Sequence, residues 1–333
     1  MENKKLIAIG EALIDFVPKE VGCSFSEVSA FSPKIGGAPA NVCGAFTKLG
    51  GDSMMITQLG DDPFGHKIAD ALTGYGIDTS AVNFTKTANT ALAFVSLDAT
   101  ANRTFSFYRS PSADMLMSPE MVKKEWFSDA YALHFCSVSL GDFPMKDAHI
   151  RAIEYAEKAG AIISFDPNLR FPLWESKEKL HDRVNEFIPK CDILKISDDE
   201  LFFLTGQKDC EQVFTVFPDA TIILLTCGEQ GSYLMTKEHR LYEKPIPVKA
   251  IDTTGAGDAF AAAFLYQLLR DGISREQLPH LSKDILQVYL RFSNAYAADS
   301  TTKYGAVHAM ATTQEFHEFL QNFHISNVII SDS

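Results

Sequence analysis

The sequence lacks several features that mark familiar functional classes. Its six cysteines are widely separated, with no Cys-x-x-Cys pair and no clustered histidine partners, so reduced and partly buried thiols are expected. Neither Gly-x-x-x-x-Gly-Lys-Ser/Thr nor Gly-x-Gly-x-x-Gly occurs, so neither a P-loop nor a dinucleotide fingerprint is supported. No apolar run approaches a membrane span, and the run at 6–9 ends too early for a signal peptide. We therefore expect a cytoplasmic protein.

Basic residues are also scarce. The 30 lysines and arginines are outnumbered by 43 aspartates and glutamates, which gives a net charge of −13. This balance argues against nucleic acid or an anionic membrane as the main partner. An acidic protein that binds a polyphosphate must concentrate positive potential locally, through helix N-termini, a few arginines and a bound divalent cation. At 333 residues with 46% apolar content, the chain can form one large α/β core, with or without a small appended domain.

The most informative stretch that is present is DTTGAGD at 252–258, which leads into an alanine-rich apolar helix. Gly255 and Gly257 can both adopt positive φ and direct successive N–H groups into one concavity, to which the helix adds its unpaired N–H groups and its dipole. Gly255, Ala256 and Gly257 are therefore predicted to form an anion hole. Asp258 could accept a proton from a hydroxyl that attacks phosphorus. For a lone Gly-x-Gly-Asp, an ordinary helix cap would be the better explanation.

The pattern along the chain predicts an α/β fold. Short apolar runs typical of buried parallel strands alternate with helical patterns from residue 131 onward. The expected strands are at 6–9, 131–135, 161–165, 193–196 and 222–226, and the expected helices are at 146–158 and 178–188. This series of βαβ units implies a doubly wound, mostly parallel sheet that binds ligands at the carboxyl ends of its strands.

A second pattern, with a period of two, begins at residue 89 and predicts a hairpin. Together with residues 24–35 it could build a small sheet outside the main core. We therefore expect one domain over 1–333 that carries a β-sheet lid, formed by segments at about 12–36 and 89–114. The alternation directs Phe107 and Arg109 to one face, where aromatic stacking and a cationic contact could meet a ligand.

The stretch at 252–258 resembles the C-terminal signature of the ribokinase-like, or PfkB-type, sugar kinases, and the resemblance extends over nearly the whole chain. GEALID at 10–15 and GGAPANV at 36–42 are similar to two further motifs of the family. The segments at 107–116 and 166–174 resemble its fructokinase branch. The resemblance implies Mg²⁺ and ATP as cofactors, fructose as the sugar, and transfer to a primary hydroxyl. Sibling alternatives are 2-keto-3-deoxygluconate kinase, ribokinase and nucleoside kinase, and a distant one is a non-catalytic sugar sensor.

The resemblance also assigns residues to the sugar. Asp15 and Asn41 correspond to the family's sugar ligands, and Gly36 with Gly37 corresponds to its hinge. Arg170 follows an expected strand, where it could bridge the sugar's reacting end and the transferring phosphoryl group.

For the nucleotide, the resemblance indicates the stretches after two expected strands and one helical position. Ser197 and Glu200 stand where the family has Asn-x-x-Glu, a motif associated with magnesium and phosphate, although Glu200 could equally be a first-turn helix acid. Thr226, Gly228 and Gly231 would lie along the phosphates and ribose, and Asn294 would face adenine.

The same resemblance implies a monovalent cation site, with K⁺ as its occupant. Its members would be Asp252, Thr254, Ser300, Lys303 and Gly305. Ala309 stands where some relatives have serine, which leaves the need for the cation open. An exposed lid sheet also offers edges through which a homodimer could form.

Overall fold

The computed structural model describes residues 4–20, 22, 25–97, 103–207 and 213–325. Its larger sheet has nine strands in the order β13-β12-β11-β10-β9-β8-β1-β4-β5. All neighbouring strands are parallel except the pairs β11 with β12 and β12 with β13. The strands are β1 (Lys5–Ile9), β4 (Asp52–Gly60), β5 (Val82–Thr85), β8 (Ala130–Cys136), β9 (Ile162–Asp166), β10 (Ile193–Ser197), β11 (Ile222–Thr226), β12 (Ser232–Met235) and β13 (Arg240–Glu243). The predicted fold class is confirmed.

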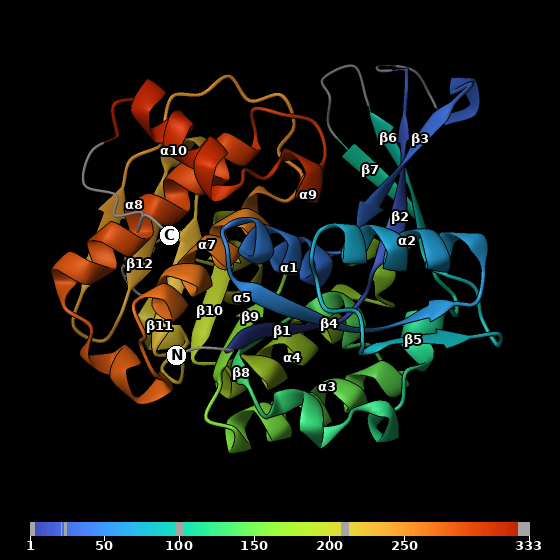
Figure 1. Cartoon of the computed structure of the whole chain (residues 1–333), viewed down its shortest axis with the longest axis horizontal. Coiled ribbons are helices and arrows are strands. Elements are labelled where there is room, and N and C mark those ends of the chain that lie inside the picture. The colour runs from blue at the N-terminus through green and yellow to red at the C-terminus, as the bar shows by residue number, and fades with distance from the viewer. Residues whose placement is uncertain (1–3, 21, 23–24, 98–102, 208–212, 326–333) are drawn as a thin grey trace.

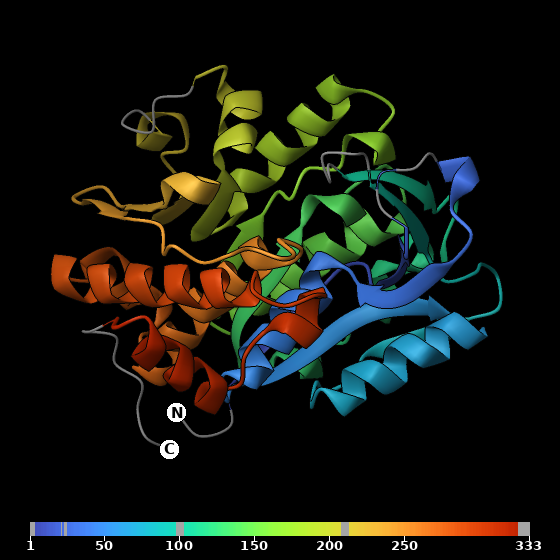
Figure 2. The ribbon, with the colours of Figure 1, turned by 90° about the horizontal axis from the view of Figure 1, so that it is seen from above.

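Helices cover both faces of this sheet, in two layers that Figure 2 shows with the strands between them. Because side chains alternate along a strand, each central strand contributes to two apolar clusters, one per face. One face packs on α3 (Pro144–Lys158), α4 (Lys177–Phe187), α5 (Asp198–Thr205) and α6 (Val213–Val216). The other packs on α1 (Ala38–Lys48), α7 (Ala256–Arg270), α8 (Lys283–Ser300) and α10 (Thr313–Asn322).

The smaller sheet stands apart from the larger one, at the upper right of Figure 1. It contains β2 (Leu13–Pro18), β3 (Phe31–Gly36), β6 (Leu92–Leu97) and β7 (Arg103–Tyr108), in the order β3-β2-β6-β7. The stretch 11–15 was expected to be a loop, but most of it is strand β2, because Leu13 and Ile14 bury their side chains while the backbone pairs with β3 and β6. Asp15 is therefore a residue of the lid sheet. The expected turn at 98–102 lies outside the described residues.

Two further α-helices belong to the described fold. Helix α2 (Pro63–Gly74) starts at Asp62, whose carboxylate accepts hydrogen bonds from the first-turn amides, and α9 (Ala306–Ala309) follows the turn after α8. Within the described residues, no helix is long and apolar enough to cross a membrane.

The topology gathers several loops at one edge of the larger sheet. Strands β1, β8, β9, β10 and β11 are parallel neighbours, so their carboxyl ends lie together. The chain continues from these ends into the lid and into the loops at 137–139, 167–173 and 227–231. Helix α7 packs across the sheet against α1 and α8, and its first turn meets the same edge. This edge is where a ligand site is expected in such a fold.

Candidate active site

Two cavities lie on either side of the turn at 253–258. The larger has a volume of about 530 Å³ and the smaller of about 80 Å³. The turn contributes residues to both walls: Thr253, Ala256 and Gly257 line the larger cavity, and Thr254, Gly255 and Asp258 line the smaller one. A group that passes from one cavity to the other must therefore pass the start of α7.

Of the two glycines at the start of α7, one has the left-handed backbone that was predicted for the anion hole. Gly255 is the N-cap residue and has a left-handed backbone, with φ of 78°, which a residue with a side chain rarely adopts. Gly257, which was also expected to have positive φ, instead lies inside the helix. That part of the prediction is wrong. Glycine is needed there for space, since a Cβ atom on Gly257 would lie 2.7 Å from the Lys195 Nζ atom.

Asp258 lies in the first turn of α7 at the wall of the smaller cavity, with 6% of its surface exposed. Its Oδ2 atom accepts a hydrogen bond of 2.8 Å from the Asn41 side chain on α1. Burial, and after it the neighbouring Asp166 carboxylate, raise the pKa of Asp258 to about 6, while Asn41, Lys195 and Arg170 act in the opposite direction. A carboxylate with this pKa is mostly ionised at neutral pH and can still accept a proton readily.

The smaller cavity brings together most of the residues predicted for the sugar. The predicted residues that line it are Asp15, Gly37, Asn41, Phe107 and Arg170, and Glu11, Phe105, Asn168 and Leu173 join them. The small sheet contributes the Asp15 carboxylate and the Phe105 and Phe107 rings, which are stacked with centroids 5.7 Å apart. Such a mixture suits a polyhydroxylated ligand.

Gly36 and Gly37 allow two chain segments to pack closely against each other. A Cβ atom on Gly36 would lie 2.1 Å from the Asp15 carboxylate, and one on Gly37 would lie 2.4 Å from the Glu11 carbonyl oxygen. Gly37 also has φ of 108°. Gly36 does not line the cavity, so the structure gives it a steric role beside Asp15 and not the direct sugar contact that was expected.

Arg109 is the second correction on the sugar side. Its guanidinium is 2% exposed, is ion-paired with Asp114, and donates hydrogen bonds to the Val138 carbonyl and to Ser139 Oγ. Ser139 in turn donates to the Glu11 carboxylate, which lines the smaller cavity. Arg109 therefore lies behind the cavity wall and supports it through Ser139.

The loop after β9 presents Arg170 to the smaller cavity. Asp166 accepts a hydrogen bond from the Asn168 amide, and Asn168 has φ of 45°, which is uncommon for a residue with a side chain. This tight turn directs the chain back, so that Arg170 reaches the same cavity as Asp258. The guanidinium lies close enough to Asp258 to lower the pKa of that carboxyl.

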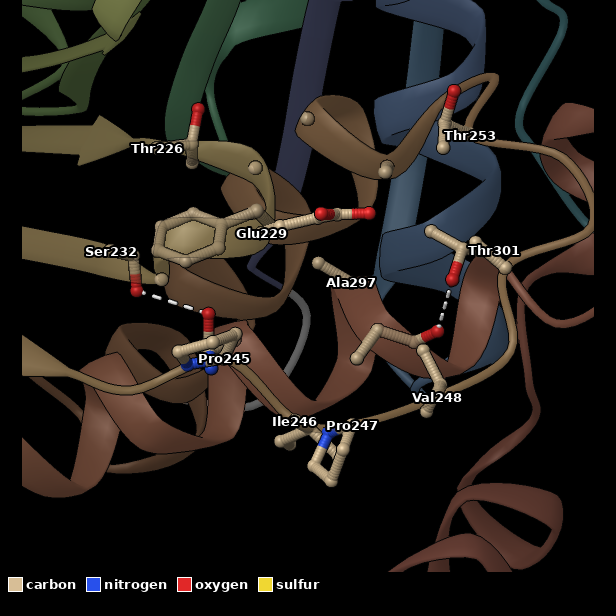
Figure 3. A pocket seen from close by; sticks show the side chains of 18 residues that line it. Thr226, Glu229, Ser232, Pro245, Ile246, Pro247, Val248, Thr253, Ala297 and Thr301 are labelled. Atoms are coloured by element: carbon tan, nitrogen blue, oxygen red, sulfur yellow. Dashed lines mark hydrogen bonds between the residues drawn. The ribbon is translucent and has the colours of Figure 1, made fainter.

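The larger cavity has a different lining. Four of the residues predicted for the nucleotide line it, namely Thr226, Gly228, Gly231 and Asn294. Figure 3 shows Pro245, Ile246, Pro247 and Val248 along one wall, opposite Thr226 and Thr253. An apolar slot with a few polar groups is typical of the sites that bind a flat heterocycle.

Asn294 connects the walls of the larger cavity. Its side chain donates a hydrogen bond of 2.8 Å to the Lys244 carbonyl and accepts one of 3.1 Å from Ser232 Oγ. These two bonds tie helix α8 to the segment at 244–248 and to strand β12. A polar side chain on the otherwise largely buried α8 is explained by this role.

Ser197 and Glu200 fit the alternative that was left open for Glu200, a first-turn helix acid. Neither lines either cavity. They form a capping box at the start of α5, in which Ser197 Oγ accepts from the Glu200 amide and Glu200 Oε2 accepts from the Ser197 amide. The other oxygen of Glu200 accepts from the Leu169 amide. One oxygen of this carboxylate thus closes the capping box and the other holds the backbone next to Arg170, so Glu200 positions the loop.

The loop after α8 is fastened to Asp252. The Asp252 carboxylate accepts hydrogen bonds from the Thr254 amide and hydroxyl and from the Gly305 amide. Ser300 donates to the Ala297 carbonyl, and Lys303 lies on the exposed turn. The stretch 252–254 and the loop at 300–305 are thus neighbours, as the predicted cation site requires.

Two parts of the site were not identified from the sequence, the segment at 245–250 and Lys195. The apolar segment at 245–250 was not singled out, although its proline-rich composition just before the DTTGAGD stretch could have suggested a rigid wall. Lys195 was treated as part of a buried strand. It is 6% exposed, and its ammonium lies 2.9 Å from the Asp166 carboxylate. A lysine within an apolar run is a usable sign, because buried lysines need a partner.

Comparison with known proteins agrees with this geometry. The model of the pfkB family of carbohydrate kinases matches residues 3–313. A probable fructokinase-2 of Arabidopsis thaliana is 44% identical, over 96% of this chain and 97% of that protein.

Solved structures are similar over almost the whole chain. A fructokinase with bound ATP from Xylella fastidiosa has a TM-score of 0.89 at 33% identity, and covers 96% of this chain and 99% of its own. A double mutant of the Vibrio cholerae fructokinase, bound to fructose, ADP and potassium ion, has a TM-score of 0.82 at 28% identity. The match covers 96% of this chain and 98% of that one. The match of the family model from residue 3 to residue 313 shows that the chain belongs to the pfkB family of carbohydrate kinases.

Proposed function

We propose that this protein is an ATP-dependent fructokinase that phosphorylates a primary hydroxyl of fructose. The position of Asp258, in the smaller cavity and on the turn that also lines the larger one, is the observation that carries the proposal. The smaller cavity would hold the sugar and the larger one the nucleotide. Fructokinases among the similar proteins, one with bound ATP and one with bound fructose and ADP, support both assignments.

The reaction follows from the order of groups along the turn. Asp258 accepts the proton of the sugar hydroxyl while the hydroxyl oxygen bonds to the γ-phosphorus of ATP. The bond from that phosphorus to its bridging oxygen breaks, and ADP leaves with the electron pair. Backbone amides at Gly255, Ala256 and Gly257, together with Arg170, would stabilise the charge on the transferring group.

The sugar is held so that only one hydroxyl reaches Asp258. Asp15 and Asn41 would accept from and donate to sugar hydroxyls, and Asn41 also orients the Asp258 carboxylate through its hydrogen bond. Phe107 on the lid would cover the apolar face of the sugar. Exclusion of water by the lid favours transfer to the sugar over hydrolysis of ATP.

Mg²⁺ is proposed as the partner of ATP. Among the described residues, no group of three or more His, Cys, Asp or Glu side chains is arranged to hold a metal ion. This fits an ion that keeps several waters and binds phosphate oxygens, as Mg²⁺ does in kinases, where it neutralises phosphate charge.

K⁺ is proposed at the 252–254 and 300–305 segments. The Asp252 carboxylate lies between Thr254 and Gly305, and oxygen donors of this kind suit a monovalent cation. A cation there would hold the loop next to the anion hole. Fructokinase activity that is unchanged when K⁺ is replaced by an organic cation such as tetramethylammonium would contradict this assignment.

The assembly and the compartment also remain proposals. Strands β3 and β7 are the edges of the lid sheet, and edge strands offer backbone groups to a second copy, which supports a homodimer through the lid. Sedimentation of the purified protein tests this, since a monomer at micromolar concentration would contradict it. Cys43, Cys136 and Cys191 are free, buried thiols, which supports the cytoplasm as the compartment.

A sugar panel tests the proposed function most directly. ADP release with ATP is measured for fructose, glucose, ribose, 2-keto-3-deoxygluconate and adenosine. We expect fructose to give the highest kcat/KM. Strong activity on another member of the panel without activity on fructose would show a sibling kinase, and stabilisation by fructose without turnover would show a sugar sensor.

A further inference from the structure

A buried ion pair lies directly behind the proposed base. Lys195 on β10 and Asp166 at the end of β9 are 6% and 1% exposed, and their charged groups are 2.9 Å apart. Burial by itself would lower the pKa of Lys195, but Asp166 and Glu200 raise it above its ordinary value, so the lysine is charged. A buried ion pair costs desolvation energy and is often no more stable than an apolar pair of the same size. Its presence here calls for a role other than stability.

The position of Gly257 locates the ammonium relative to the anion hole. A Cβ atom at Gly257 would lie 2.7 Å from Lys195 Nζ and 3.4 Å from its Cε. The backbone of Gly257 is helical, so its conformation would allow a side chain, but a side chain there would require the lysine to shift. Lys195 therefore places a full positive charge against the first turn of α7, next to Asp258.

The two members of the pair act on Asp258 in opposite directions. Asp166 raises the pKa of Asp258, second only to burial, and Lys195 lowers it. Other titratable or charged groups approach from each element packed around this carboxylate. They are Glu11 after β1, Cys136 on β8, Arg170 after β9 and Glu200 on α5, and the uncharged Asn41 approaches from α1.

We propose that the Lys195–Asp166 pair is a positioning unit for phosphoryl transfer, in which Asp166 anchors the ammonium and Lys195 keeps Asp258 ionised beside the anion hole. This inference rests on the proposed kinase activity with Asp258 as its base. A neutral side chain at position 195 would leave two carboxylates facing each other in a buried site. One of the two carboxylates would then hold a proton at neutral pH. If Asp258 holds it, Asp258 cannot act as the base.

The test is the pH profile of kcat/KM for fructose in three variants. In the unmodified protein we expect activity to fall below about pH 6, as Asp258 becomes protonated. Lys195→Met should move this acid limb upward by about one pH unit or more, because an attractive charge near Asp258 is removed. Asp166→Asn should move it downward, because a repulsive charge is removed. The double variant should return toward the original profile.

Opposite shifts are a readout that a merely structural role would not produce. Lys195→Arg keeps the charge, so its acid limb should stay within a few tenths of a pH unit of the original even if kcat falls. A matched control is Asp192→Asn, which removes a partly buried carboxylate, paired with Arg275, immediately before β10. Its acid limb should not move. Melting curves of all variants verify that the folded protein is being assayed.

Three results would overturn the inference. The first is an acid limb that does not move in either Lys195→Met or Asp166→Asn. The second is an acid limb that moves in the same direction in these two variants. The third is an acid limb that moves by an equal amount in Asp192→Asn. If Lys195→Met does not fold, Asp166→Asn and Lys195→Arg still decide the question. Full activity of Asp258→Asn would instead contradict the proposed function itself, so the two failures are distinguishable.

Discussion

The two cavities beside the start of α7 are built from different kinds of residues. The smaller cavity is lined by ionisable groups, including Glu11, Asp15, Arg170 and Asp258. The larger cavity is lined mainly by glycine, alanine, proline and aliphatic side chains, with Glu229 as its one ionisable lining residue. A sugar must be held by directional hydrogen bonds, whereas an adenine ring is held by a flat apolar slot. The comparison predicts that single substitutions should cost far more in the smaller cavity.

The largest effect is expected at Asp258, which serves the chemistry and not only binding. Asp258→Asn should lower kcat by about 10²-fold or more while fructose still binds, because the amide cannot accept the proton. The same change should raise the melting temperature by a few degrees, since an ionised carboxylate with a pKa near 6 is destabilised by burial and by Asp166. Steady-state kinetics, isothermal titration with fructose and a thermal melt check the three parts. Unchanged turnover would remove Asp258 from the mechanism.

The next largest effect is expected on the lid. Asp15→Asn should raise the KM for fructose by roughly 10- to 100-fold, the cost of losing a hydrogen bond to a charged group, and leave the KM for ATP unchanged. Asp15 is on β2, so this also tests whether the lid carries a sugar ligand. A matched control is Lys34→Ala, directly opposite Asp15 on β3 but outside the smaller cavity. Equal changes in both KM values would contradict the separation of the two cavities.

A smaller effect is expected in the larger cavity. Asn294→Ala removes the hydrogen bonds to Lys244 and Ser232 that connect its walls. At about 0.5–1.5 kcal/mol for each bond, with some compensation by water, the KM for ATP should rise by about 3- to 10-fold. The KM for fructose should stay constant. Steady-state kinetics with each substrate varied in turn measures this, and a larger effect on fructose than on ATP would reverse the assignment of the cavities.

The same contrast explains which parts of the site could be predicted. The acidic and glycine-rich motifs of the smaller cavity stand out in the sequence, because a catalytic carboxylate or a left-handed glycine permits few substitutes. Asp15, Asn41, Arg170 and Asp258 were predicted from their motifs, and the structure brings all four to one cavity. The apolar wall at 245–250 was not predicted, since many apolar residues form an equivalent surface.

Three of the predicted site residues have partners within the protein. Arg109, Gly36 and Glu200 have the residue types of ligands, but each is occupied by a protein partner within or behind the site. Arg109 is held by Asp114, Gly36 gives room to Asp15, and Glu200 caps α5 and holds Leu169. Motif position alone does not distinguish a group that faces a ligand from one that supports its neighbour.

By itself, the sequence determined the alternation of buried strands and helices, the lid strands at 92–97 and 103–108, and the turn at 252–258. These depend on local periodicity and on backbone freedom, which are properties of neighbouring residues. Only the tertiary structure decided that Lys195 lies under Gly257, that Asn41 reaches Asp258, and that Asp252 fastens the loop at 305. The residues of each such pair are 53 to 217 positions apart, and their contact energies exist only once the sheet has brought their strands and helices together.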